Sequence, residues 1–155
     1  MITFKNVVDF LDTIADKHYE IKSFHNGFLD EVDIAKLGAG DYPILYSEPG
    51  PSTIDKGVMT YSFTIYVLDM IREDMSDRQY TFSENLRIIQ DVINEFKHSL
   101  YSTSWVDNEV VLQTPITAEP FTARFDNILT GWNATISLQV KNTNNLCVVP
   151  VDPNS

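Results

Sequence analysis

The sequence predicts an α+β fold, in which two amphipathic helices pack on one face of a mostly antiparallel sheet. Two segments, residues 4–15 and 81–100, repeat apolar residues at the helical period of 3.6. Two others, residues 58–67 and 131–141, alternate apolar and polar residues as half-buried strands do. At 155 residues the chain fits one domain. We expect this domain to span residues 1–148, with a C-terminal tail over 149–155.

The first helix is predicted to begin after Thr3, whose hydroxyl can cap it. Its apolar residues recur on one face: Phe4, Val7, Val8, Leu11, Ile14 and Ala15. Residues 19–24 then suggest a short strand, and Asn26-Gly27 is a strong turn pair. Another short strand is predicted from Pro43 to Tyr46.

Residues 47–57 are predicted to form a long exposed loop. Prolines lack the backbone N–H that a strand pair needs, and two of them, Pro49 and Pro51, interrupt this segment. We therefore expect the sheet pairing to stop after Tyr46.

The strand that follows changes its polarity near its end. Its apolar side chains up to Val67 share one face, but Leu68 and Met70 then fall on the face that was polar, and Asp69 falls on the apolar one. This crossover predicts that the far end of the strand leaves its own core. Something else must cover it.

Thr81 and Glu84 have the spacing of a capping box and predict the start of the second helix. Its predicted apolar stripe contains Phe82, Leu86, Ile89, Val92, Ile93, Phe96 and Leu100. Two short strands broken at Pro115 and Pro120 are expected next, where prolines suit sheet edges or bends. The last strand has these residues facing the core: Trp132, Ala134, Ile136, Leu138 and Val140.

Composition argues against several classes of protein. The net charge of −11 disfavours nucleic-acid binding, which needs clustered Lys and Arg. The single Cys147 cannot form an internal disulfide or a zinc site of the usual type. Acidic residues interrupt the apolar N-terminal segment, so we expect neither a signal peptide nor a membrane span there, and an intracellular site of assembly.

No recognisable catalytic motif occurs in the sequence. The histidines, His18, His25 and His98, are scattered without ligand spacing, and the acids of residues 69–77 lack the pattern of a calcium loop. We therefore expect no enzyme activity, no cofactor and no bound metal.

The order of elements resembles the tail-terminator, or tail-completion, proteins of tailed bacteriophages. The likeness is carried by an N-terminal amphipathic helix, "YPILY", a Pro/Gly loop, "GVMTYSFTIYVLD", "TFSENLRIIQDVINEF" and "GWNATISLQV". The closing "ILTGWNATISLQVKNTNNLC" looks most like small neck or tail-joining proteins in phages of Bacteroidota hosts, including the crAss-like group.

This resemblance implies a structural virion protein, assembled in the host cytoplasm, whose copies form a ring in the tail or neck. Tail terminators form rings of six, and twelve copies are expected if the ring sits beside the portal. Adjacent neck, tail or portal-proximal proteins would be its partners, and DNA would pass through the ring without specific binding or contact with a membrane. In the same family a long hairpin or strand projects from each subunit to its neighbours.

On this reading, several residues acquire expected roles. Leu68 and Met70 would lie on a strand that a neighbouring subunit completes, and the acids Asp69, Asp74 and Asp77 would line the channel or face an adjacent ring. Two Pro-containing segments, 47–57 and 114–121, would supply contacts within the ring. Their candidate residues are Glu48, Pro49, Pro51, Asp55, Pro115 and Pro120.

Other functions remain open from the sequence. Within the virion, a portal-proximal adaptor ring or a tail-tube or baseplate component has the same general character. Outside it, a small acidic metal-dependent hydrolase would need distant carboxylates such as Asp69 and Asp126 to meet. An acidic module that binds a host protein is also compatible with the net charge.

Overall fold

The fold was obtained as a computed structural model, which describes residues 3–27, 42–70, 78–102, 110–124 and 128–141. Within these ranges the chain forms two helices, α1 (Phe4–Lys17) and α2 (Arg78–Ser102), and one seven-stranded sheet. The strands are β1 (Ser23–Asn26), β2 (Ile44–Pro49), β3 (Thr53–Asp55), β4 (Val58–Met70), β5 (Val111–Leu112), β6 (Ala118–Arg124) and β7 (Ile128–Lys141).

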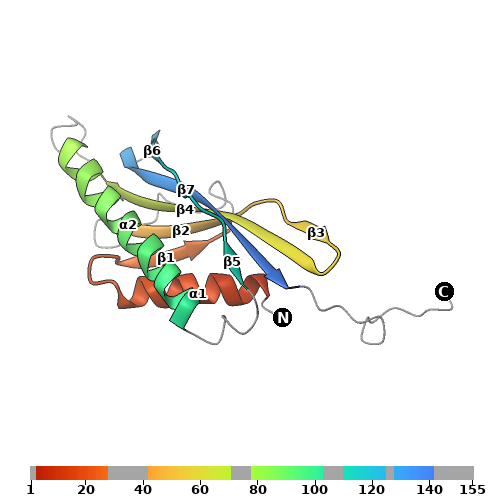
Figure 1. Cartoon of the computed structure of the whole chain (residues 1–155). Helices are drawn as coiled ribbons and strands as arrows, with labels where there is room; N and C mark the ends of the chain where they lie inside the picture. Colours follow the sequence, from red (N-terminus) through yellow and green to blue (C-terminus); the bar gives the residue numbers. More distant parts are fainter. Residues whose placement is uncertain (1–2, 28–41, 71–77, 103–109, 125–127, 142–155) are drawn as a thin grey trace.

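The long strands β4 and β7 form the centre of the sheet (Figure 1). They pair antiparallel from Val58 opposite Lys141 to Met70 opposite Leu129, over the whole of β4. Strands β2 and β3 pair with β4, and β5 and β6 pair with β7, all antiparallel. Only β1 runs parallel to its neighbour β2 within the described sheet. The predicted α+β class with a mostly antiparallel sheet is confirmed.

Helix α1 begins as predicted. The Thr3 hydroxyl accepts a hydrogen bond from the Asn6 backbone N–H at 3.2 Å, and the Asn6 side chain accepts one from the Thr3 N–H at 2.9 Å. This reciprocal cap satisfies two backbone donors at the helix start. The buried residues of α1 are Val7, Leu11, Ile14 and Ala15, all on the predicted face.

Helix α2 differs from the prediction at its start and in its buried face. It begins at Arg78, so Thr81 lies inside the helix and does not cap it. Asn85 is fully buried and donates from its amide to the Thr130 carbonyl at 3.3 Å, which turns a polar residue toward the sheet. Leu86, expected in the apolar stripe, is 39% exposed. The buried apolar residues are Ile88, Ile89, Val92 and Phe96.

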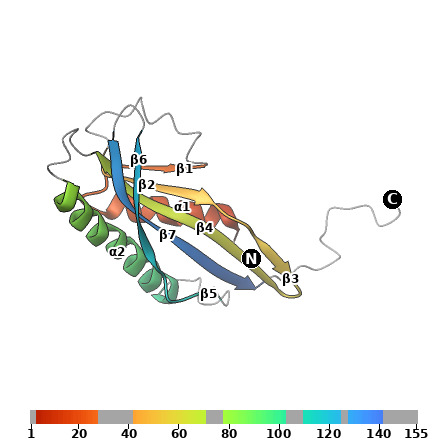
Figure 2. The same ribbon diagram turned by 90° about the horizontal axis from the view of Figure 1, so that it is seen from above.

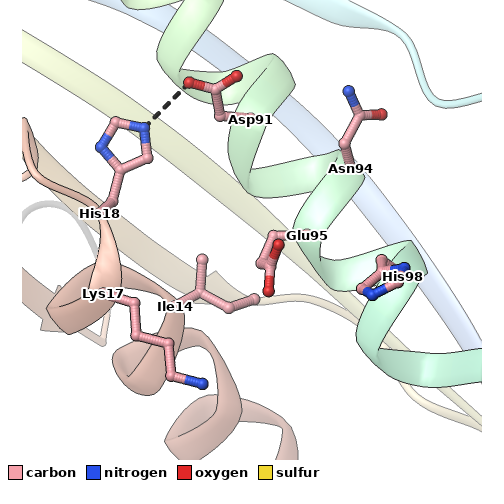
Figure 3. A pocket seen from close by; sticks show the side chains of 7 residues that line it. All are labelled: Ile14, Lys17, His18, Asp91, Asn94, Glu95 and His98. Carbon is pink, nitrogen blue, oxygen red and sulfur yellow. Dashed lines mark hydrogen bonds and ion pairs between the residues drawn. The ribbon is translucent and has the colours of Figure 1, made fainter. Parts of the chain in front are cut away.

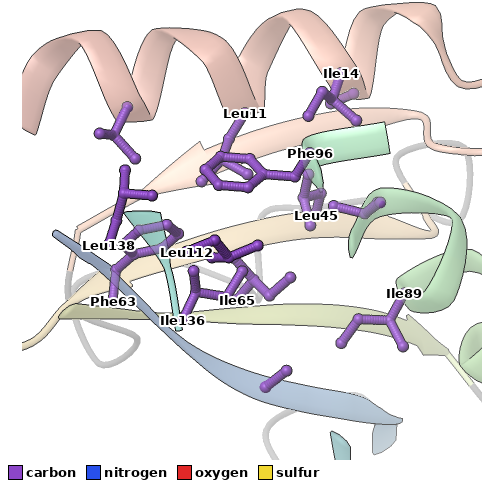
Figure 4. Close-up of a cluster of buried hydrophobic side chains, with 14 of the residues drawn as sticks. Leu11, Ile14, Leu45, Phe63, Ile65, Ile89, Phe96, Leu112, Ile136 and Leu138 are labelled. Atoms are coloured by element: carbon purple, nitrogen blue, oxygen red, sulfur yellow. The ribbon is translucent and has the colours of Figure 1, made fainter. Parts of the chain in front are cut away.

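Both helices cover the same face of the sheet and share one core with it (Figures 1, 2 and 4). The ring of Phe96 in α2 packs edge-on against Phe10 of α1 and Phe63 of β4, with ring centroids 5.3 and 6.2 Å apart. The predicted inward face of β7 is buried from Ala134 to Val140, and Trp132 packs partly buried against the same core. This core holds the two helices on the central strands.

A second, smaller apolar cluster lies on the opposite face, at the end of β4 where the polarity changes. Leu68 is fully buried there with Tyr42, Ile44 and Leu129, and Met70 packs against the same group. Since strand side chains alternate between faces, the crossover after Val67 marks a sheet covered on both sides at this end.

The prediction that this end of β4 leaves its own core was therefore wrong, and the inter-subunit role of Leu68 and Met70 had been inferred from it. Residues of the same chain bury Leu68 and pair with β4 to its last residue.

Neither helix in the described part of the chain has both the length and the apolar character that crossing a lipid bilayer requires.

Candidate assembly interface

The sheet pairing continues through the segment predicted as a long loop. Pro49 is still in β2, opposite Phe63, and the Gly50 N–H donates to the Ser62 carbonyl at 2.8 Å. After Pro51 the chain returns to the same neighbour, because β3 pairs antiparallel with the start of β4. The prediction of a long loop was wrong, since proline at an edge strand needs no partner for its missing N–H.

A tight turn joins β3 to β4. It consists of Lys56 and Gly57, and Gly57 has a positive φ of 71°, which glycine adopts without steric cost. The Asp55 carboxylate accepts a hydrogen bond from the Lys56 N–H at 2.7 Å. Short hairpin turns of this kind keep the flanking strands in register.

The tip of this hairpin carries exposed aliphatic side chains. Ile54 is 69% exposed and Val58 is 39% exposed. Ile54 pairs with Met59, which contacts the main core, whereas Val58 lies on the opposite face of the ribbon. The hairpin reaches past the helices in both views (Figures 1 and 2). We name residues 53–58 the hairpin tip.

The predicted contact residues fall into two groups on opposite edges of the β4–β7 pair. Glu48 and Pro49 are half-buried in β2, and Pro51 and Asp55 are exposed along the chain into the hairpin tip. These four residues share the β2–β3 side of the sheet.

The remaining two predicted contact residues lie on the other side. Pro115 is exposed after β5, and Pro120 is exposed within β6, which pairs with β7 alone among the described strands. Pro120 stands opposite Trp132 and occupies an edge, as prolines in sheets do. The chain thus offers two distinct surfaces from the two predicted segments.

Of the predicted channel acids, only Asp69 lies within the described residues. Its side chain is half-buried, on the helix-covered face of β4, and it accepts a hydrogen bond from the Met70 N–H at 2.8 Å. It lines a pocket of about 410 Å³ together with Lys22, Glu84 and Asn85. Asp74 and Asp77 lie outside the described residues.

A second pocket, of about 500 Å³, lies between the two helices and was not foreseen from the sequence (Figure 3). The His18 ring donates from Nε2 to the Asp91 carboxylate at 3.0 Å, because its Nδ1 accepts the Glu20 backbone N–H at 3.1 Å. His98 and Glu95 line the same pocket from α2. The pairing joins residues 73 positions apart, a distance over which no local spacing rule applies.

An ionic network continues from this pocket along α2. Arg87 donates to Glu84 at 2.8 Å and also bonds to Glu20, and it lies 3.5 Å from Asp91. The carboxylates of Glu84 and Glu20 raise the pKa of the Arg87 guanidinium above its usual range. Through Glu20, these contacts connect the segment that follows α1 to α2.

The described residues contain no group of three or more His, Cys, Asp or Glu side chains able to hold a metal ion. The carboxylate pair considered for a hydrolase includes Asp126, which lies outside the described residues.

A search with models of known protein families gives no match to this chain, and no curated protein matches its sequence.

Proposed function

We propose that this protein is a structural subunit that assembles into a ring in the neck or tail of a bacteriophage particle, as a tail terminator or a head–tail joining protein. The observation that carries the proposal is the hairpin tip. Its two aliphatic residues, Ile54 and Val58, are exposed to solvent on a hairpin in which β3 pairs with the start of β4. The resemblance to tail terminators supplies the biological setting.

Single exposed apolar residues are common on protein surfaces and need no explanation. Here, however, two of them share the end of a paired hairpin beyond the helices (Figure 2). Burying one such side chain contributes roughly 1.5–3 kcal/mol. A contact with another subunit would gain this free energy with little further loss of conformational entropy, because strand pairing already orders the hairpin.

Two different surfaces on one subunit favour a closed ring. A head-to-tail contact joins one patch to a different patch on the next copy, and such contacts form rings when the rotation closes. The hairpin side and the β5–β6 side of this chain lie on opposite edges of the β4–β7 pair and suit such an arrangement.

The proposed role is structural and not catalytic, and the acidic charge fits it. In a ring around the genome path, a net charge of −11 per subunit repels phosphate and leaves DNA free to move. We assign Asp69, Asp74 and Asp77 to the channel wall or to a contact with an adjacent ring. A portal-proximal adaptor or a tail-tube component would share these features and would differ in copy number.

Mass measurement over a concentration series tests the proposal. Native mass spectrometry of the whole chain, from about 1 μM to several hundred μM, should show a closed species of six or twelve copies, with few open intermediates. A species that stays monomeric at every concentration, and that also fails to assemble with neck proteins encoded beside it, would contradict the proposed ring.

A further inference from the structure

The pocket of about 410 Å³ beside Asp69 has a buried floor and an exposed aromatic rim. Thr81, Asn85 and Ile88 form the floor, and all three are buried. Tyr19 and Tyr80 stand at the rim, where both are exposed. The segment after α1, the end of β4 and the first part of α2 thus surround one cavity, which we name the Asp69 pocket.

Asn85 has an unmade hydrogen bond on this floor. Its Nδ2 donates to the Thr130 carbonyl at 3.3 Å, and this contact fixes the orientation of the amide because a carbonyl oxygen can only accept. The other end of the amide, Oδ1, is buried and has no hydrogen-bond partner within the described part of the chain. Since buried acceptors in folded proteins nearly always receive a donor, this oxygen marks a place where a ligand can donate.

The charges around the pocket favour a donor that is cationic. Glu20, Asp69 and Glu84 line it with carboxylates, and Lys22 is the one cation among the described lining residues. Arg87, beside the pocket, binds Glu20 and Glu84. Even with Arg87 counted, three carboxylates face two cations, and the net charge of −11 adds a general attraction for positive ligands.

We infer that the Asp69 pocket binds an arginine guanidinium group, either of free arginine or of a partner protein. Asn85 Oδ1 and the Asp69 carboxylate accept its N–H groups, and the exposed rings of Tyr19 and Tyr80 offer faces on which it can stack. The site lies on one subunit and does not require the proposed ring.

A guanidinium suits this pocket better than an ammonium group does. It is more weakly hydrated, so its transfer into a partly buried site costs less, and it carries five N–H donors in one plane and stacks on aromatic rings. Because Asn85 Oδ1 is itself buried, binding requires exposed rim side chains such as Tyr80 to turn aside.

Titration of the full-length protein with matched peptides tests this assignment. The probes are acetyl-Gly-Arg-Gly-amide, its citrulline counterpart, which has nearly the same shape but no charge, and its lysine counterpart. Calorimetry measures affinity, and NMR signals of the Asn85 side-chain amide report the place of binding. We expect the arginine peptide to bind at least about tenfold more tightly than the citrulline peptide, the difference that one charge-assisted hydrogen bond makes. The lysine peptide should bind more weakly than the arginine peptide.

Substitutions in the pocket give a second readout. Asp69→Asn and Asn85→Leu should each weaken binding of the arginine peptide at least about tenfold, because each removes an acceptor from a charged donor. Asp12→Asn is the matched control: it neutralises a carboxylate that is exposed on α1 and lies outside the pocket. Its binding should stay within about twofold of wild type, because water and salt screen distant exposed charges. Thermal unfolding of each variant checks that the fold is intact.

Free arginine amide distinguishes the two sources of the guanidinium. Tighter binding of the peptide assigns the pocket to a partner protein, and equal binding assigns it to the free amino acid. Equal affinity of the arginine and citrulline peptides, or unchanged binding by folded Asp69→Asn, would overturn the inference and leave water as the donor to Asn85. Equal affinity of the arginine and lysine peptides would overturn the choice of a guanidinium. None of these results depends on whether copies assemble, so the ring stands or falls separately by mass measurement.

Discussion

A glycine in β7 determines how closely the two central strands approach one another. Gly131 is buried and stands opposite Leu68. A Cβ at this position would lie 1.8 Å from the Val67 carbonyl oxygen, far inside any tolerable contact. Nothing in the alternating pattern of the last strand indicates this constraint, because the pattern records polarity and not the separation of backbones.

Replacing Gly131 by Ala is expected to destabilise the fold strongly. The β4 backbone must move to admit the methyl group, so we expect a loss at or above the upper end of the roughly 1–3 kcal/mol typical of overpacking. Chemical denaturation measures it. Gly57→Ala is the control: no atom lies within 4 Å of its added Cβ, and only the positive φ adds strain, roughly 1–2 kcal/mol. Equal losses in the two variants would show that the strands separate easily.

We expect Tyr66 to make the stability of the fold sensitive to alkaline pH. Its side chain contacts Tyr46 and Phe121 on the face of the second cluster. Burial and, to a smaller extent, the charge of Glu48 raise its pKa above the ordinary value of 10.0. A raised pKa in the folded state means that the unfolded chain releases the proton first.

The contribution of Tyr66 to the free energy of unfolding should therefore be fully present below pH about 10. It should be lost as the pH rises through the pKa of Tyr66 in the folded state. Tyr66→Phe removes the ionisable group, so its unfolding free energy should decline less steeply above pH 10 than that of the wild type. Denaturant titrations at pH 8–11 measure this slope, with Tyr80→Phe, at a residue 71% exposed, as the control. Identical slopes for Tyr66→Phe and wild type would contradict the assignment.

At the scale of elements, the two ends of β4 have different tasks. Near the Met70 end, Val67 and Leu68 are buried on the two faces of the sheet by residues of their own chain. The Val58 end forms the exposed hairpin with β3. The prediction that this strand leaves its own core after Val67 was wrong, because a polarity crossover can mean either an unfinished strand or a second cluster on the other face. The sequence analysis did not predict the exposed hairpin at the Val58 end.

The helices and long strands were predictable for a physical reason. Thr3 and the alternation from Ala134 to Val140 are local patterns, and their burial follows from periodicity. The hairpin was not predicted because Pro49 and Pro51 favoured a loop over residues 47–57, although Gly57, directly after Lys56, was a usable turn signal. The His18–Asp91 pair forms only through tertiary packing, so no local spacing of residues in the sequence could predict it.

Two substitutions, one near each end of β4, test whether the two ends differ in their contribution to the stability of the fold. Leu68→Ala should cost about 2–5 kcal/mol of unfolding free energy, as expected for a fully buried leucine. Ile54→Ala, at a residue 69% exposed, should stay within about 0.5 kcal/mol of wild type. Denaturant unfolding of dilute, monomeric protein checks both values. A small loss for Leu68→Ala would revive the view that this end is completed by another subunit.

For the whole molecule, the described residues form a layered domain whose two helices leave the hairpin uncovered (Figures 1 and 2). The fold is complete within one chain for both of its apolar clusters. Assembly is therefore expected to join folded subunits and not to finish their folding. The net charge of −11 opposes close approach of copies at low ionic strength, so added salt should promote assembly by screening it.

The central claim is that the apolar hairpin tip holds copies of this protein together. Sedimentation velocity of wild type, Ile54→Asp and Thr53→Asp at equal concentration tests it most directly, because both variants add one charge at neighbouring exposed positions of β3 and only the first removes an aliphatic side chain. We predict that Ile54→Asp weakens association by at least about tenfold, since burial of this side chain contributes more than 1.4 kcal/mol, and that Thr53→Asp assembles nearly as wild type does. Rings of Ile54→Asp as stable as those of the wild type would contradict the account.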